Sequence, residues 1–102
     1  MPYIHVSMSK KITDAEKEKL MKEFGQEISI LEGKSEKWLM VNISDGQSMC
    51  FQGDDKKPCA IIEASVYGAA SADEYGKLTG VLTETVSETA EIPGDRIYVK
   101  YT

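Results

Sequence analysis

The chain has 102 residues, of which 41% are hydrophobic and 28% are charged, values typical of one soluble folded domain and not of a disordered chain. Its net charge of −5 argues against a nucleic-acid partner, because proteins that bind nucleic acids usually present a basic face. No apolar run approaches the roughly 18–20 residues that span a bilayer, so no membrane insertion is expected.

The N-terminal stretch from Met1 to Lys11 contains no long apolar segment and so does not predict a secretory signal. We therefore expect a cytoplasmic protein, or one that leaves its cell without a signal peptide. Two cysteines are too few for a disulfide scaffold, and one histidine is too few for a histidine-rich metal site.

The first helix is predicted over residues 13–32. Thr13 and Glu16 form a capping box, in which the threonine hydroxyl accepts a hydrogen bond from the third helical N–H and the glutamate reaches back to the N-cap. Apolar residues then recur at helical spacing, and Gly33 is expected to end the helix. These apolar residues are Leu20, Met21, Phe24, Ile28 and Leu31.

The second helix is predicted over residues 71–90 by the same kind of pattern. Ser71 and Glu74 form its capping box, and the dipeptide Pro93-Gly94 is expected to close it. Its apolar stripe consists of Tyr75, Leu78, Leu82, Val86 and Ala90.

Strands are predicted before and after each helix, at residues 3–7, 38–44, 60–67 and 96–101. The first residues of the two capping boxes are 58 positions apart, and the same offset pairs Ile4 with Ile62. The sequence therefore predicts two β-α-β units, at about residues 2–44 and 60–102. In each unit the helix crosses over to a parallel strand.

Two such units predict an α/β fold, with a four-stranded mixed sheet and both helices on one face. The turn-rich segment Met49–Pro58 connects the units, so residues 1–102 are expected to form a single domain. The other face of the sheet also carries apolar residues, and we expect another copy of the chain to cover it.

Proline at position 2 is the residue that most needs an explanation. The initiator methionine is normally removed when the next residue is small, so Pro2 would become the N-terminus and carry a secondary amine. An α-amino group titrates at about 7.7–8.0, and burial or a nearby cation lowers its pKa. Such an amine is a general base near neutral pH and needs no cofactor. Proline at this position is, however, also common in proteins where it has no catalytic role.

An ordered set of motifs supports the catalytic interpretation of Pro2. The proline is followed, in order, by Gly33-Lys34, Met49-x-Phe51-x-Gly53, Pro58-Cys59-Ala60, Tyr67-Gly68 and Asp95-Arg96-Ile97-Tyr98-Val99. From Pro2 to about Tyr101 the chain resembles the macrophage migration inhibitory factor family of the tautomerase superfamily. The resemblance implies the β-α-β repeat described above, assembled as a homotrimer with active sites between subunits.

The same resemblance implies an isomerase, a keto–enol tautomerase that acts on phenylpyruvate and similar α-keto acids without a cofactor. Pro2 falls on the catalytic base of the family, and Lys34 on a lysine that binds the substrate anion and lowers the pKa of that base. Tyr67 corresponds to a residue whose backbone N–H contacts the ligand. Trp38 corresponds to a pocket aromatic that would stack on an aryl ring, and Tyr98 to a tyrosine that reaches the site from a neighbouring subunit.

Several of these residues have a structural alternative. A cation such as Lys34 is favourable near a helix C-terminus in any protein. Trp38 and Tyr98 are also consistent with ordinary interface aromatics. Lys100 replaces an asparagine of the family. Within the site it would add a second cation and favour a dianionic or more polar acid, whereas in solvent it would have no such effect.

The sequence departs from the family in two further places. Cys59 has Ile62 where the family's Cys-x-x-Cys pair has its second cysteine, so the thiol–oxidoreductase activity of that pair is not expected. Cys50 is expected to be a buried thiol, and the alternative is an exposed, reactive one. The chain ends at Thr102, before a C-terminal segment that longer members carry, so a more open site is expected.

Two rival interpretations of function follow from the same resemblance. One is a cytokine-like signalling or ligand-binding protein, with a vestigial pocket and a receptor or host-protein partner. The other is an enzyme that keeps the amine but hydrates or dehalogenates an unsaturated acid.

Overall fold

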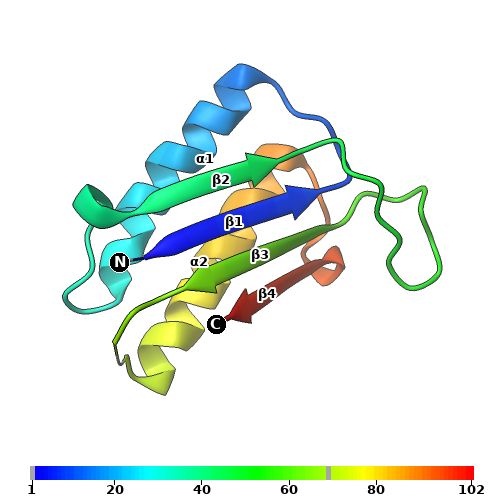
Figure 1. The fold of residues 1–102 in the computed structure, drawn as a ribbon. Helices are drawn as coiled ribbons and strands as arrows, with labels where there is room; N and C mark the ends of the chain where they lie inside the picture. Colours follow the sequence, from blue (N-terminus) through cyan, green and yellow to red (C-terminus); the bar gives the residue numbers. More distant parts are fainter. Residues whose placement is uncertain (1, 69) are drawn as a thin grey trace.

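The computed structural model of the protein describes residues 2–68 and 70–102, so the predicted removal of Met1 lies outside the described residues. The elements, in chain order, are β1 (Tyr3–Met8), α1 (Asp14–Glu27), η1 (Ile28–Ile30), η2 (Glu36–Trp38), β2 (Met40–Ser44), β3 (Ala60–Ser65), α2 (Ala72–Ala90), η3 (Gly94–Arg96) and β4 (Ile97–Tyr101), where η marks a 3₁₀ helix. The strands form a four-stranded sheet in the order β2-β1-β3-β4, with α1 and α2 on one face (Figure 1). In the described part of the chain, no helix has the length and apolarity to cross a membrane.

The strand pairing repeats within the chain. β1 runs parallel to β2, and β3 runs parallel to β4, and in both pairs each residue lies opposite the one 37 positions later. β1 and β3 run antiparallel through the centre of the sheet, with His5 opposite Glu63. These two residues are also 58 positions apart, so the two halves are related by a pseudo-twofold axis that passes between them. The predicted β-α-β repeat and the mixed sheet are therefore confirmed.

Both predicted capping boxes are present. The Thr13 hydroxyl accepts a hydrogen bond from the backbone N–H of Glu16, and the Ser71 hydroxyl accepts one from the N–H of Glu74, each at 3.1 Å. Each glutamate carboxylate accepts in return from the N–H of the capping residue, at 2.8 and 3.0 Å. The helices therefore start where the sequence predicts.

The first helix is shorter than predicted. Its α-helical part ends at Glu27 and η1 tightens the next turn, so the prediction of a helix over residues 13–32 is wrong at its C-terminal end. The Ser29 hydroxyl donates to the carbonyl oxygen of Gln26 at 2.7 Å, and such a local bond competes with the α-helical pattern. Gly33, which was expected to end the helix, lies in the following turn with a φ of +82°.

The second helix ends through a residue in the left-handed conformation. Glu91 follows α2 with a φ of +56°, and Gly33 lies 58 positions before it. The two left-handed residues therefore occupy equivalent positions in the two halves, but the C-cap of α1, Ile28, is in a right-handed conformation and Gly33 comes only after η1. The dipeptide Pro93-Gly94, expected to close the second helix, lies just beyond this turn.

Four strand boundaries differ from the prediction, and the smallest difference is that β1 ends at Met8, one residue later than expected. Trp38 was expected to begin a strand but lies in η2, because its N–H donates to the carbonyl oxygen of Ser35 at 3.2 Å and closes a turn. The strand itself begins at Met40. Tyr67 lies beyond the end of β3, and Arg96 lies before the start of β4.

The connector Met49–Pro58 is rich in turns, as predicted. Within it, Phe51 and Asp54 each donate a backbone N–H to the carbonyl oxygen of the other, at 3.1 and 3.0 Å. Cys50 was expected to be a buried thiol, but it is exposed, because the chain has left the sheet and the core at this point. Cys59, next to the start of β3, is buried.

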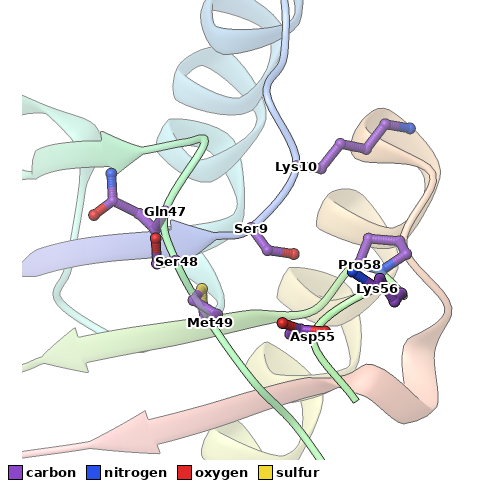
Figure 2. A pocket seen from close by; sticks show the side chains of 8 residues that line it. All are labelled: Ser9, Lys10, Gln47, Ser48, Met49, Asp55, Lys56 and Pro58. Carbon is purple, nitrogen blue, oxygen red and sulfur yellow. The ribbon is translucent and has the colours of Figure 1, made fainter.

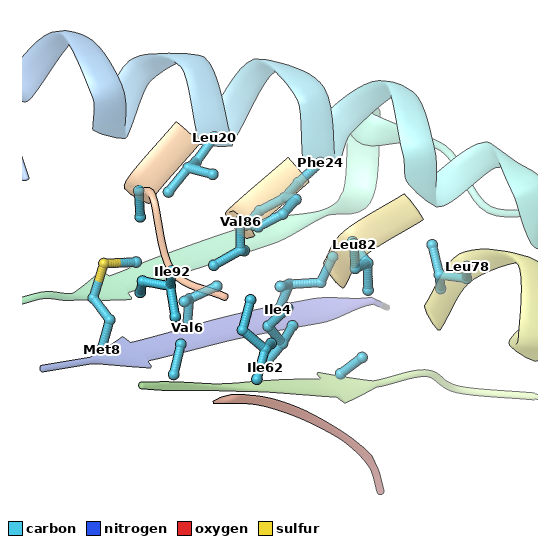
Figure 3. Close-up of a cluster of buried hydrophobic side chains, with 14 of the residues drawn as sticks. Ile4, Val6, Met8, Leu20, Phe24, Ile62, Leu78, Leu82, Val86 and Ile92 are labelled. Atoms are coloured by element: carbon cyan, nitrogen blue, oxygen red, sulfur yellow. The ribbon is translucent and has the colours of Figure 1, made fainter. Parts of the chain in front are cut away.

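The hydrophobic core lies between the sheet and the helices (Figure 3). Alternate residues of β1 and β3 are buried, as expected for strands with one covered face. Fully buried side chains of the strands and helices meet in this layer, among them Ile4, Val6, Met8 and Ile62 from the sheet and Leu20, Phe24, Leu78, Leu82 and Val86 from the helices.

The opposite face of the sheet is mixed in character. Met40 and Tyr98 are exposed on it, but its centre is polar. The Nε2 atom of His5 is 3.0 Å from the Ser44 hydroxyl, and the Nδ1 atom is 3.7 Å from a Glu63 carboxylate oxygen. The expectation that this face carries apolar residues is therefore met only at some positions, and the covering subunit stays a prediction.

Candidate active site at the start of the first strand

Pro2 is buried at the beginning of β1. Its carbonyl oxygen accepts a hydrogen bond from the N–H of Met40 at 3.1 Å, so the pairing of β1 with β2 includes this residue. In Figure 1 the start of the chain lies at the end of the sheet where β1 and β2 begin and β3 finishes. The sheet thus fixes the main chain of Pro2 in a sheltered place.

Lys34 lies at the same end of the sheet, in the turn after η1. Its backbone N–H donates to the carbonyl oxygen of Leu31 at 3.1 Å. The residues on both sides of it are exposed, whereas Lys34 itself is half-buried. Its side chain lies against Gly68, where a Cβ atom would be 3.5 Å from Nζ. The lysine is therefore folded onto the chain that follows β3.

Two aromatic residues lie at this end of the sheet. Tyr67 follows β3 by two residues and is 83% exposed, while Trp38 precedes β2 by two residues and is 59% exposed. The Nζ atom of Lys37 lies 5.1 Å from the centre of a Trp38 ring, so a cation already contacts this indole. The structure thus places four of the predicted site residues, Pro2, Lys34, Trp38 and Tyr67, at one end of the sheet.

The other two predicted site residues lie elsewhere in the chain. Tyr98 and Lys100 are exposed on β4, which is separated from β1 by β3. The Tyr98 ring packs edge-to-face against Phe51, with ring centres 4.9 Å apart. Tyr98 also lines a small, mainly apolar cavity of about 210 Å³, together with Cys59 and with the first residues of the connector. Lys100 pairs in register with Glu63 of β3. A single chain therefore does not bring Tyr98 or Lys100 to Pro2.

A larger cavity, of about 510 Å³, lies at the opposite end of the sheet (Figure 2). It is lined by segments that follow β1 and β2 and precede β3, including Ser9, Lys10, Gln47 and Asp55. No predicted site residue lines it, and sequence reasoning missed it, because its lining comes from two loops, the one after β1 and the two ends of the long connection between β2 and β3. Among the residues that the structure describes, no three His, Cys, Asp or Glu side chains are grouped so that they could hold a metal ion.

Glu74 lies near Lys34, and the sequence did not predict one of its two contacts. Besides closing its capping box, its carboxylate accepts a hydrogen bond from the backbone N–H of Glu32 at 2.7 Å. The N–H groups of Ser71 and Glu32 lower the pKa of Glu74, so the carboxylate is ionised at neutral pH. The capping motif was the only signal in the sequence, and it gives no information about the contact with Glu32.

Arg96 is a second residue with an unexpected function in the fold. It is 7% exposed, and its guanidinium donates to backbone carbonyl oxygens of the connector and not to a carboxylate. Nε donates to Pro58 at 2.9 Å, and Nη2 donates to Lys57 at 3.1 Å and to Asp54 at 3.3 Å. The guanidinium also lies 5.1 Å from the Phe51 ring centre. Arg96 therefore shapes the connector against which Tyr98 packs.

The sequence and the fold both resemble those of one protein family. The sequence model of the family described as Macrophage migration inhibitory factor (MIF) matches residues 1–102. A macrophage migration inhibitory factor of Xenopus laevis is 24% identical over 88 residues, which are 86% of this chain and 76% of that protein. The crystal structure of Leishmania major MIF2 superposes with a TM-score of 0.91 at 25% identity, covering 100% of this chain and 87% of that one. A macrophage migration inhibitory factor of Toxoplasma gondii gives a TM-score of 0.89 at 24% identity, covering 98% and 87% of the two chains.

Proposed function

Because this chain belongs to the macrophage migration inhibitory factor family, whose members have the tautomerase fold, we propose that it is a cofactor-independent keto–enol tautomerase of phenylpyruvate-like α-keto acids. The observation that carries the proposal is that a buried Pro2 and a half-buried Lys34 lie at the same end of the sheet. Acid–base chemistry at a carbon next to a ketone needs a base and an anion site close together.

In this proposal Pro2 is the general base after removal of Met1. The unprotonated secondary amine takes a proton from the carbon next to the ketone of the substrate. The protonated amine then returns this proton to the enolate oxygen, directly or through a water molecule, which completes the change from keto to enol form and restores the free amine. Burial of Pro2 supports this role, because desolvation disfavours the protonated amine and lowers its pKa.

Lys34 is proposed to bind the carboxylate of the substrate. Its position against Gly68 supports this role, because the ammonium is held at the end of the sheet and not extended into solvent. Its charge also disfavours protonation of a nearby amine. Trp38 and Tyr67 present exposed aromatic surface at this end, which suits a substrate with an aryl ring.

We also propose that the active protein is a homotrimer, in which Tyr98 and Lys100 of one chain lie beside Pro2 of the next. Both residues are exposed on β4 and distant from Pro2 of their own chain, which supports a contribution to another chain's site. Lys100 would add a second cation and favour more polar or dianionic acids over phenylpyruvate itself. Measurement of the native mass by sedimentation equilibrium tests the trimer.

The first experiment is the intact mass of the protein, followed by a phenylpyruvate tautomerase assay on the wild type and on Pro2→Gly. Glycine is also small, so the variant keeps a processed N-terminus and exchanges a secondary for a primary amine. We expect a mass without Met1 and a loss of kcat/KM of about 10²–10⁴-fold in the variant. A processed wild type with no activity would instead favour a ligand-binding or signalling protein, and equal activity in the two proteins would show that catalysis does not depend on the secondary amine of Pro2.

A mixing experiment tests the shared site. Pro2→Gly chains and Tyr98→Ala chains are each expected to be weakly active alone. When they are unfolded together and refolded, mixed trimers contain sites with Pro2 from one chain and Tyr98 from another. We expect activity to reappear in the mixture, whereas a site confined to one chain would leave it at the average of the two variants.

A further inference from the structure

The carboxylate of Glu74 joins two segments that are distant in sequence. One oxygen, Oε1, accepts from the N–H of Ser71 at 3.0 Å and closes the capping box of α2. The other oxygen, Oε2, accepts from the N–H of Glu32 at 2.7 Å, across 42 positions of sequence. Hydrogen bonds to an ionised carboxylate are roughly twice as strong as those between neutral groups. Glu74 therefore connects the start of α2 firmly to the turn after η1.

The second hydrogen bond is not a requirement of helix capping. Glu16 occupies the equivalent place in the capping box of α1, and its carboxylate accepts from the N–H of Thr13 at 2.8 Å. Among the described residues, the hydrogen bonds of Glu16 stay within its own box. The two boxes are thus matched in sequence and geometry, and only the box of α2 reaches another segment.

The turn that Glu74 contacts carries Lys34. Glu32 is two residues before this lysine, and the N–H of Lys34 closes the turn on the carbonyl oxygen of Leu31. Ser71, whose N–H binds the other oxygen of Glu74, comes three residues after Gly68, and the Lys34 ammonium lies against Gly68. The Glu74 carboxylate therefore holds together the turn that carries Lys34 and the segment between Gly68 and α2. The contact between Lys34 and Gly68 depends on how these two segments lie.

We propose that Glu74 is a positioning residue, which holds the Lys34 ammonium in its anion-binding place through the backbone of Glu32. The proposal rests on the function proposed above for Lys34. It predicts that loss of the contact between Glu74 and Glu32 weakens the binding of an anionic substrate more than it slows the chemical step.

Glutamine substitution separates the two contacts. Glutamine is accepted at this place of a capping box but offers a single acceptor oxygen, so Glu74→Gln keeps at most one of the two hydrogen bonds. Glu16→Gln makes the same chemical change where only the box is present. We expect KM for phenylpyruvate to rise about fivefold to tenfold in Glu74→Gln with kcat within about twofold, and neither constant to change by more than about twofold in Glu16→Gln. Alanine substitutions at the two positions remove both acceptors, and Glu74→Ala should raise KM at least as much.

A second readout does not depend on activity. Amide hydrogen exchange followed by NMR should show faster exchange of the Glu32 N–H in Glu74→Gln than in the wild type, with no change in Glu16→Gln. Faster exchange with an unchanged KM would overturn the positioning role, as would equal KM values in the two glutamine variants. If the wild type neither binds nor converts phenylpyruvate, both this inference and the proposed function fail. An active wild type with an unaffected Glu74→Gln variant refutes the positioning role alone.

Discussion

The ammonium of Lys34 lies against the backbone of Gly68, where a Cβ atom would stand 3.5 Å from Nζ. Gly68 also has a φ of +99°, a conformation that residues with a side chain rarely adopt. Glycine is therefore favoured at this place by its backbone conformation and not by the space beside Nζ, because 3.5 Å is an ordinary van der Waals separation.

Replacement of this glycine should cost stability. Gly68→Ala imposes a strained backbone conformation, and we expect the free energy of unfolding to fall by about 1–3 kcal/mol. Gly76→Ala is the matched control, because Gly76 lies within α2 and an added Cβ would meet nothing within 4 Å. At Gly76 the substitution should raise the free energy of unfolding by about 0.5–1 kcal/mol. Urea denaturation of both variants at one protein concentration gives the comparison, and equal shifts would contradict this account of Gly68.

Removal of the Lys34 charge should affect both binding and the pH profile. We expect Lys34→Met to raise KM for phenylpyruvate by about tenfold or more, because the anion loses a charged partner. Loss of the cation should also raise the pKa of the Pro2 amine, so the acidic limb of the kcat/KM profile moves to higher pH. Lys22→Met, at an exposed position of α1, is the control. A limb that stays in place would show that Lys34 does not influence the base.

The parts of the fold that depend on local spacing could be predicted from the sequence. The capping residues Thr13 and Ser71 and the apolar stripes of the helices are periodic signals, and the offset of 58 positions predicted the repeat. The start of the second strand could not be predicted in this way. Trp38 continues the apolar pattern into Met40, but the strand begins where Met40 bonds to Pro2, a residue far away in sequence.

The candidate site could be proposed in its residue types but not in its contacts. Pro2 was proposed because a free N-terminal amine suits acid–base chemistry and Lys34 because it fits the pattern of the family, and both assignments stay predictions. The contact between Lys34 and Gly68, and the bond between Glu74 and Glu32, join separate segments and leave no periodic trace. Arg96 was likewise overlooked, because its partners are backbone carbonyl groups, which every residue has.

The Arg96 clamp should be important for stability. Arg96→Met removes the guanidinium donor from the carbonyl oxygens of Pro58, Lys57 and Asp54 and takes away a nearly buried side chain, and we expect a loss of about 1–3 kcal/mol in unfolding free energy. Lys22→Met, at an exposed position of α1, should change it by no more than about 0.5 kcal/mol. Limited proteolysis should cut the Arg96→Met connector between residues 51 and 58 faster than that of the wild type. Unchanged cleavage would mean that the connector does not depend on the guanidinium.

Glu27 should make the protein less stable as the pH rises. Desolvation raises the pKa of this carboxyl, and Glu23 and Glu84 raise it further, although Thr85 donates a hydrogen bond to one oxygen. The other oxygen is buried and has no partner. Because the folded pKa lies above the unfolded one, the stabilising contribution is complete below about 4.5 and is lost as pH rises through the folded pKa.

Glu27→Gln removes the desolvated charge and keeps an acceptor for Thr85. We therefore expect the variant to be more stable than the wild type at pH 7, with a smaller difference at pH 4. Glu88 is exposed and, like Glu27, lines a shallow cavity between α1 and α2. Glu88→Gln should therefore change the stability little at either pH. Thermal melts of the three proteins at both pH values give the result, and a variant that gains equally at the two pH values would rule out the charge as the cause.

The shared register of the two halves gives each residue from 2 to 44 a counterpart 58 positions later. The counterparts of Pro2 and Lys34 are Ala60 and Ile92, both apolar and almost fully buried. The second half has thus kept the framework of the first while using the equivalent places for packing. Inhibition by a reagent that modifies the N-terminal amine should consequently be complete at one equivalent per chain, although each chain contains two similar halves.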